Sequence, residues 1–208
     1  MKIKNPGQYT VYDGDDVVKV VGTGKGVVIR QSGGDVWTYG KSAPVIIMTR
    51  GLVRTFGSSA PVIHQSSGYV STWGSSAPFI IMTDGEVSTW ESSSPIILMT
   101  GGEVRTCGKS APVIIMTRGY VSTLYSTAPV INMTGGYVWT FGSSAPVIHQ
   151  SGGDVRTLGT SAPVITMTIG EVSTFGTSTP IINQSGGDVW TLEKSAPVIH
   201  KIKKRQTK

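Results

Sequence analysis

The chain has 208 residues, of which only 14% are charged, and it contains 27 glycines. Apolar residues recur at fixed intervals, which excludes a disordered polymer, and the single cysteine, Cys107, excludes an internal disulfide framework and a multi-cysteine metal site. The formal net charge of +6 comes from the two ends of the chain, because residues 33–200 hold eight basic and nine acidic residues.

Residues 1–32 lack the repeat that fills the rest of the chain. The opening MKIKNPGQYT has no apolar run typical of a signal peptide, so we expect synthesis in the cytoplasm without a signal. Residues 28–34 (VIRQSGG) match half of a later unit. We therefore predict an N-terminal cap and a first half-coil over 1–32, since the open end of a β array exposes unpaired strand edges.

Residues 33–200 repeat every 17 residues, which predicts a repeat architecture. The stretch SAPVIIMTRG occurs at residues 42–51 and again at 110–119. Ten prolines follow one another at this interval without insertion or deletion: Pro44, Pro61, Pro78, Pro95, Pro112, Pro129, Pro146, Pro163, Pro180 and Pro197.

Each unit predicts two short strands, near residues 35–39 and 45–49 of the first unit, because β-branched residues alternate there between glycine, proline and serine. Proline every 17 residues excludes helix. A single unit cannot bury its own apolar face, whereas stacked units can. The sequence therefore predicts an all-β, single-chain β-solenoid (β-helix) of about ten 17-residue coils.

Alternation along the strands assigns the inward side chains. Three rows are constant across the repeats and are expected inside: the rows that begin at Val36, Thr38 and Ile46. The row of Met48 shares the face of Ile46 and alternates between methionine and glutamine. A glutamine placed there needs hydrogen-bond partners within the rod.

The outward side of the first strand is the candidate ligand-binding face. Aromatic side chains suit sugar stacking or a protein interface, and arginines punctuate the same face. The residues of this face are Trp37, Tyr39, Tyr69, Trp73, Trp90, Tyr137, Trp139, Phe141, Trp190, Arg54, Arg105 and Arg156.

Carboxylates also stack on this face, at Glu86 and Glu103 and again at Asp154, Glu171 and Asp188. A spacing of about 4.8 Å between them approaches that of a retaining glycosidase. We instead expect Arg105 and Arg156 to neutralise them, so the prediction is no enzyme, no catalytic residue, no cofactor and no metal site.

The outward side of the second strand is the candidate assembly face, with Ile47, Phe79, Ile81, Leu98 and Ile115. Two partly apolar outer faces are too many for a solitary soluble rod. Either the rods associate, or the inward and outward assignment is wrong on one face.

Residues 201–208 form a basic C-terminal tail with Lys201, Lys203, Lys204, Arg205 and Lys208. No aromatic residue accompanies these cations, so we expect a solvated tail and no nucleic-acid partner. No stretch of the chain is long and apolar enough to span a membrane.

The segments GDVRTLGTSAPVITMTIG (153–170) and VIHQSGGDVRT (147–157) resemble the repeats of bacterial autotransporter and haemagglutinin-type passenger domains. The resemblance implies a right-handed β-helical stalk. The chain departs from that pattern in its shorter coil and in the Pro-Val that stands where the family usually has glycine.

These observations favour a non-enzymatic structural or adhesive rod that binds itself or other structural proteins, as in a virion fibre, a spike or a surface filament. Two alternatives stay open. The aromatic and carboxylate face suits a polysaccharide-binding or depolymerising spike, and a threonine ladder at solenoid spacing suits ice binding. The final location, virion or cell surface, is left open by the sequence.

Overall fold

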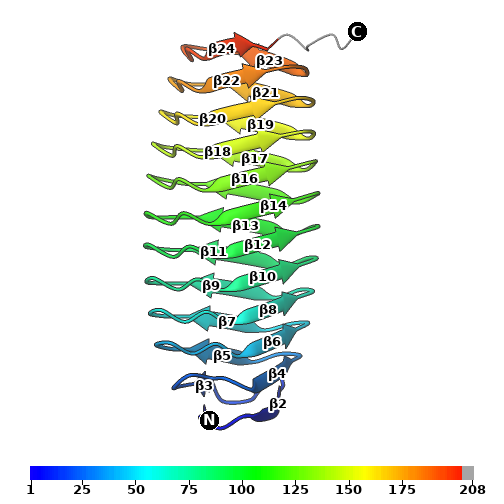
Figure 1. The fold of residues 1–208 in the computed structure, drawn as a ribbon, viewed down its shortest axis with the longest axis vertical. Helices are drawn as coiled ribbons and strands as arrows, with labels where there is room; N and C mark the ends of the chain where they lie inside the picture. The colour runs from blue at the N-terminus through cyan, green and yellow to red at the C-terminus, as the bar shows by residue number, and fades with distance from the viewer. Residues whose placement is uncertain (203–208) are drawn as a thin grey trace.

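The computed structural model describes residues 1–202 and shows a β-solenoid rod, which confirms the predicted fold (Figure 1). Two sheets of 12 strands each run the length of the rod, and every strand pair within them is parallel. Residues 1–202 contain no helix, and so none that is long and apolar enough to cross a membrane.

Odd-numbered strands form one sheet, here sheet A, and even-numbered strands form the other, sheet B. Sheet A consists of β1 (Lys2–Ile3), β3 (Val18–Val20), β5 (Asp35–Thr38), β7 (Leu52–Thr55), β9 (Tyr69–Thr72), β11 (Glu86–Thr89), β13 (Glu103–Thr106), β15 (Tyr120–Thr123), β17 (Tyr137–Thr140), β19 (Asp154–Thr157), β21 (Glu171–Thr174) and β23 (Asp188–Thr191). Sheet B consists of β2 (Gly7–Val11), β4 (Val27–Gln31), β6 (Val45–Met48), β8 (Val62–Gln65), β10 (Phe79–Met82), β12 (Ile96–Met99), β14 (Val113–Met116), β16 (Val130–Met133), β18 (Val147–Gln150), β20 (Val164–Met167), β22 (Ile181–Gln184) and β24 (Val198–Lys201).

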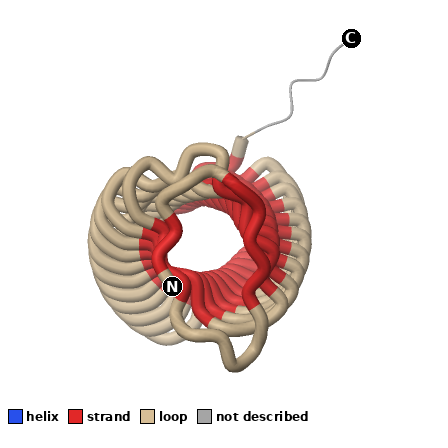
Figure 2. The backbone as a smooth tube through the Cα atoms, turned by 90° about the horizontal axis from the view of Figure 1, so that it is seen from below, coloured by secondary structure: helices blue, strands red, loops and turns tan. Residues whose placement is uncertain are grey.

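Each strand pairs with the equivalent strand of the next coil, so identical residues stack along the rod. Val36 pairs with Val53, and Ile46 pairs with Ile63. Seen along the rod axis, the strands enclose the interior and the loops project outside them (Figure 2). The solenoid is therefore a stack of nearly identical coils with one continuous core.

The N-terminal segment contributes more strand than the half-coil predicted for residues 1–32. Strands β1 to β4 all lie before residue 32, and they extend the ten repeats by two further coils. Tyr9 packs against the core at this end, and its hydroxyl donates a hydrogen bond to the Asn5 carbonyl at 3.0 Å. The basic tail was predicted for residues 201–208; Lys201 ends β24, and residues 203–208 lie outside the described part of the chain.

The inward rows are those predicted from alternation, except in the last coil, where Thr191 and Ile199 are exposed. Val36, Thr38, Ile46 and Met48 are all 0–1% exposed. Gln65 is also buried, and its side-chain amide donates to the backbone carbonyls of Gly68 and Glu86 at 2.8 and 3.2 Å. A glutamine thus replaces methionine inside the rod by hydrogen bonding to the turn of its own coil and to the next coil.

A ladder of buried hydroxyl groups runs through the interior, and sequence analysis missed half of it. The inward threonines from Thr38 to Thr157 each donate to a buried serine or threonine in the next coil, as Thr123 does to Ser144 at 3.0 Å. Equivalent bonds join Thr55 to Ser76, Thr72 to Ser93, Thr89 to Ser110, Thr106 to Thr127, Thr140 to Ser161 and Thr157 to Ser178. These threonine hydroxyls face the core, where they cannot meet an ice surface.

The first serine of the ladder tests what the hydroxyl bond contributes. Ser42 has no hydrogen-bond partner for its hydroxyl, because Val20 stands where later coils have threonine. We expect Ser144→Ala to destabilise the fold by about 1–3 kcal/mol, because it leaves the buried Thr123 hydroxyl without its acceptor. Ser42→Ala should be neutral or stabilising. Urea denaturation of the two variants makes the comparison, and equal losses would contradict it.

Candidate binding faces

The outer face of sheet B is apolar and free of formal charge. From β6 to β22 no strand of this sheet contains Lys, Arg, Asp or Glu. Ile96 and Ile115 are each 45% exposed on it. The first outward position of every strand from β6 to β24 is apolar: Val45, Val62, Phe79, Ile96, Val113, Val130, Val147, Val164, Ile181 and Val198.

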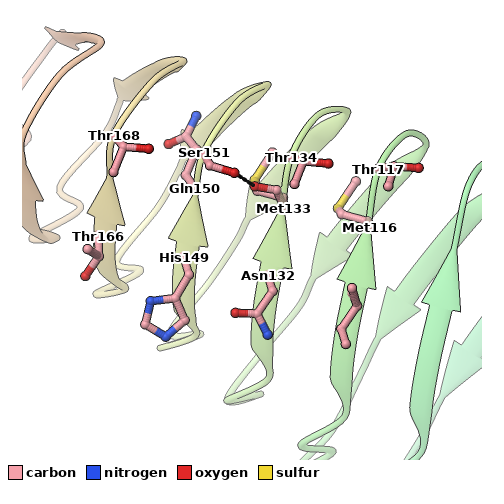
Figure 3. A pocket seen from close by; sticks show the side chains of 11 residues that line it. Met116, Thr117, Asn132, Met133, Thr134, His149, Gln150, Ser151, Thr166 and Thr168 are labelled. Carbon is pink, nitrogen blue, oxygen red and sulfur yellow. Dashed lines mark hydrogen bonds between the residues drawn. The ribbon is translucent and has the colours of Figure 1, made fainter.

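The second outward row of sheet B changes character along the rod. It is mainly apolar up to β14, where Ile81, Leu98 and Ile115 stand in successive strands. It becomes polar at Asn132 and His149, which project to the same side of neighbouring strands and line a shallow hollow (Figure 3). The five predicted assembly residues, Ile47, Phe79, Ile81, Leu98 and Ile115, all project outward on this face.

The outer face of sheet A gathers most of the predicted aromatic residues into clusters. Near the N-terminal end, Trp37 lies between the Lys19 amine and the Arg54 guanidinium, each 5.3 Å from a ring centroid of its indole. Tyr39 stacks on Phe56 with centroids 5.1 Å apart. Rings that contact cations and one another leave less open ring surface for a sugar.

Two tryptophans of the next coils form a second pair. Trp73 and Trp90 are stacked at 5.1 Å with an interplanar angle of 7°, and the Trp73 indole donates to the Ser71 hydroxyl at 2.6 Å. Together with Arg54 and Tyr69 they line a shallow hollow on sheet A. Aromatic rings therefore make up most of the lining of this hollow.

The C-terminal half of sheet A holds a smaller cluster around Trp139. Tyr120 lies edge-on to it at 5.6 Å, Phe141 lies at 5.8 Å, and the Arg156 guanidinium covers the ring at 5.4 Å. Sequence analysis missed Tyr120, although the repeat places it one coil from Tyr137 in the same row. The remaining predicted residues stand apart, with Tyr137 53% and Trp190 58% exposed.

Arg105 pairs with the carboxylates, as predicted. Its guanidinium contacts Glu103 at 2.7 Å and Glu86 of the preceding coil at 3.6 Å, and these are the ion pairs among residues 1–202. The hydrogen bond to Glu103, opposed by burial and supported by both acidic charges, raises the pKa of Arg105. The paired carboxylates are therefore engaged in a salt-bridge network on the rod surface.

Arg156 differs from the prediction that it neutralises Asp154. In the register of β17 and β19 its partner is Trp139, and the guanidinium stacks on that indole. A planar guanidinium gains as much from an aromatic face as from an exposed carboxylate. Arg156 therefore contacts Trp139 of the neighbouring coil instead of Asp154, which is nearer in sequence.

Cys107 fills an apolar position on sheet A. The side chain is 4% exposed, and burial raises the pKa of its thiol against the opposing charge of Arg105. A buried thiol of raised pKa is a poor nucleophile. No three His, Cys, Asp or Glu side chains of residues 1–202 cluster as metal ligands.

The two faces thus differ in what they offer: sheet A presents stacked rings and ion pairs, whereas sheet B presents an uncharged apolar strip. No family model, curated protein or solved structure matches the chain, so the resemblance to autotransporter passenger repeats is carried by the repeat motif alone.

Proposed function

We propose that the protein is a non-enzymatic structural rod that self-associates, or docks into a larger assembly such as a virion fibre, a spike or a surface filament. The docking surface is the outer face of sheet B. The observation that carries the proposal is the combination of outward placement, apolar side chains and the lack of charge from β6 to β22.

The size of this face suits a protein interface. The strip is about 43 Å long, because it contains the nine strands from β6 to β22. It is about 20 Å wide from the row of Ala43 to the row of Thr49, which gives an area of roughly 850 Å². A standard interface covers about 800 Å² on each partner. The strip includes the threonine and serine row of Thr49, and the contiguous exposed apolar rows beside it are typical of interaction sites on soluble proteins.

Changing Ile81, Leu98 and Ile115 together to Lys should dissociate the assembly, because the three ammonium groups would have to leave water to enter the contact. The measurement is the particle mass by analytical ultracentrifugation: a multiple of 22.0 kDa for the wild type and 22.0 kDa for the variant. Circular dichroism checks that the strands remain, and a threonine triple variant replaces the lysine variant if it unfolds.

The matched control changes Ser75, Ser92 and Ser126 to Lys. These serines are exposed in a turn row where Lys41 and Lys109 occur naturally, so the rod tolerates lysine there. The control should keep the wild-type mass. A wild type that sediments as a single 22.0 kDa species at micromolar concentration would overturn the proposed self-association.

A further inference from the structure

We infer that the partner of the sheet B outer face is a second copy of this chain, packed face to face with its rod running in the opposite direction about a two-fold axis at β12. This inference rests on the proposed function and specifies its contact. Three features of sheet B support it: the order of residues along the second outward row, the pairing of the other outward rows, and the distribution of charge.

The second outward row of sheet B is nearly palindromic around Leu98. From β8 to β16 it reads His64, Ile81, Leu98, Ile115 and Asn132. A two-fold axis parallel to the strands at β12 places Leu98 against the partner's Leu98 and Ile81 against the partner's Ile115. It also places His64 against the partner's Asn132, so an imidazole meets an amide that can hydrogen-bond to it.

The same operation matches the other rows. Rotation about an axis parallel to the strands does not change how far along its strand a residue lies. The apolar row that begins at Val45 therefore faces the same row of the partner. A two-fold axis along the rod instead reverses the strand direction. When that axis passes through the row of Ile47, it sets the apolar row against the row of Thr49, which holds threonine or serine up to Ser185. Apolar area is therefore covered best when the rods are antiparallel.

Overlap and charge favour the same arrangement. β12 is the sixth of the 12 strands of sheet B, so rotation about it covers every strand except β24. Arg30, which projects outward from β4 beside the strip, then lies opposite the uncharged Thr166 of β20. Lys201, which ends β24, comes to lie at opposite ends of the dimer in the two copies, which avoids like-charge repulsion between them.

Cysteine crosslinking distinguishes the two orientations. Leu98→Cys places two thiols together on the axis, so a short bismaleimide should convert the assembled protein to a covalent dimer. Ile47→Cys should not crosslink, because its copy lies across from β18, six strands or about 29 Å away. A mixture of Ile81→Cys and Ile115→Cys proteins should give covalent heterodimers. The wild type is the blank, since Cys107 is buried in sheet A.

Each outcome bears on a different step. A monomeric mass overturns the dimer together with the proposed self-association on which it rests. An assembled mass with crosslinking of Ile47→Cys as efficient as that of Leu98→Cys rejects the antiparallel arrangement and leaves assembly through sheet B intact. An assembled mass with no crosslink at either position rejects the two-fold axis at β12.

Discussion

Ile131→Asp is expected to destabilise the rod by at least about 4 kcal/mol, because it places an unpaired carboxylate in the core. Ile131 is 0% exposed and is stacked between Ile114 and Ile148 of the neighbouring coils. Its side chain lies in the middle of the rod, far from the two ends, so fraying of an end coil cannot expose the new carboxylate to water. In a chain of this length such a loss lowers the melting temperature by about 8–16 °C.

The matched control for this variant is Asn132→Asp, one residue along the same strand. Asn132 projects outward from β16, so the same charge there remains hydrated and should change stability by less than about 0.5 kcal/mol. Thermal melts followed by circular dichroism compare the two variants. The larger loss for Asn132→Asp would mean that the faces of β16 are assigned the wrong way round, and similar melting temperatures would contradict the difference in burial between the two residues.

The inward rows could be predicted because the period of 17 keeps every coil in the same register. Alternation along a strand has a period of two, so fixing one row such as Ile46 fixes its neighbours on the strand. Repetition then carries the assignment from Ile46 to Ile182, and these residues are 0% exposed. The buried glutamines followed from the same argument, with backbone carbonyls as the hydrogen-bond acceptors that burial requires.

The buried serine row escaped prediction because alternation was applied to strands alone. Ser42 lies in the turn before Pro44, where side-chain direction depends on turn geometry and not on the pleat. The available signal for this row was its constancy: a serine or threonine stands two residues before the proline in every repeat. Small hydroxyl residues are common in turns for other reasons, so this signal was ambiguous.

The first two coils escaped prediction because their turns differ in length from the rest. Val18 pairs with Val36, an offset of 18 residues where the later coils have 17. One extra residue in a turn removes a coil from the repeat while the strands stay in register. The contact of Arg156 on the outer face of sheet A also could not be predicted from its neighbours in sequence. Its guanidinium stacks on Trp139 of the neighbouring coil, and the stacking of the coils fixes that contact.

The two glycine rows at the turns differ in how much they tolerate a side chain. Gly119 has a φ of 103°, and a Cβ there would lie 2.6 Å from the Gly102 carbonyl oxygen and 2.6 Å from the Met99 methyl carbon. That carbonyl accepts the Tyr120 backbone N–H at 2.9 Å. An added methyl group must therefore displace the backbone of the preceding coil.

Gly119→Ala should destabilise the rod by about 3 kcal/mol, from the left-handed backbone conformation and the weakened hydrogen bond between coils. The matched control is Gly142→Ala in the other turn row, with a φ of 60° and no contact shorter than 3.4 Å for a Cβ. That row already holds Glu91, Tyr125 and Glu193 at φ values of 56°, 61° and 60°. The control should lose about 1–2 kcal/mol, the usual penalty for a side chain in this conformation. Denaturant unfolding of both variants gives the difference, and equal losses would show that the close approach at Gly119 contributes nothing beyond its backbone angle.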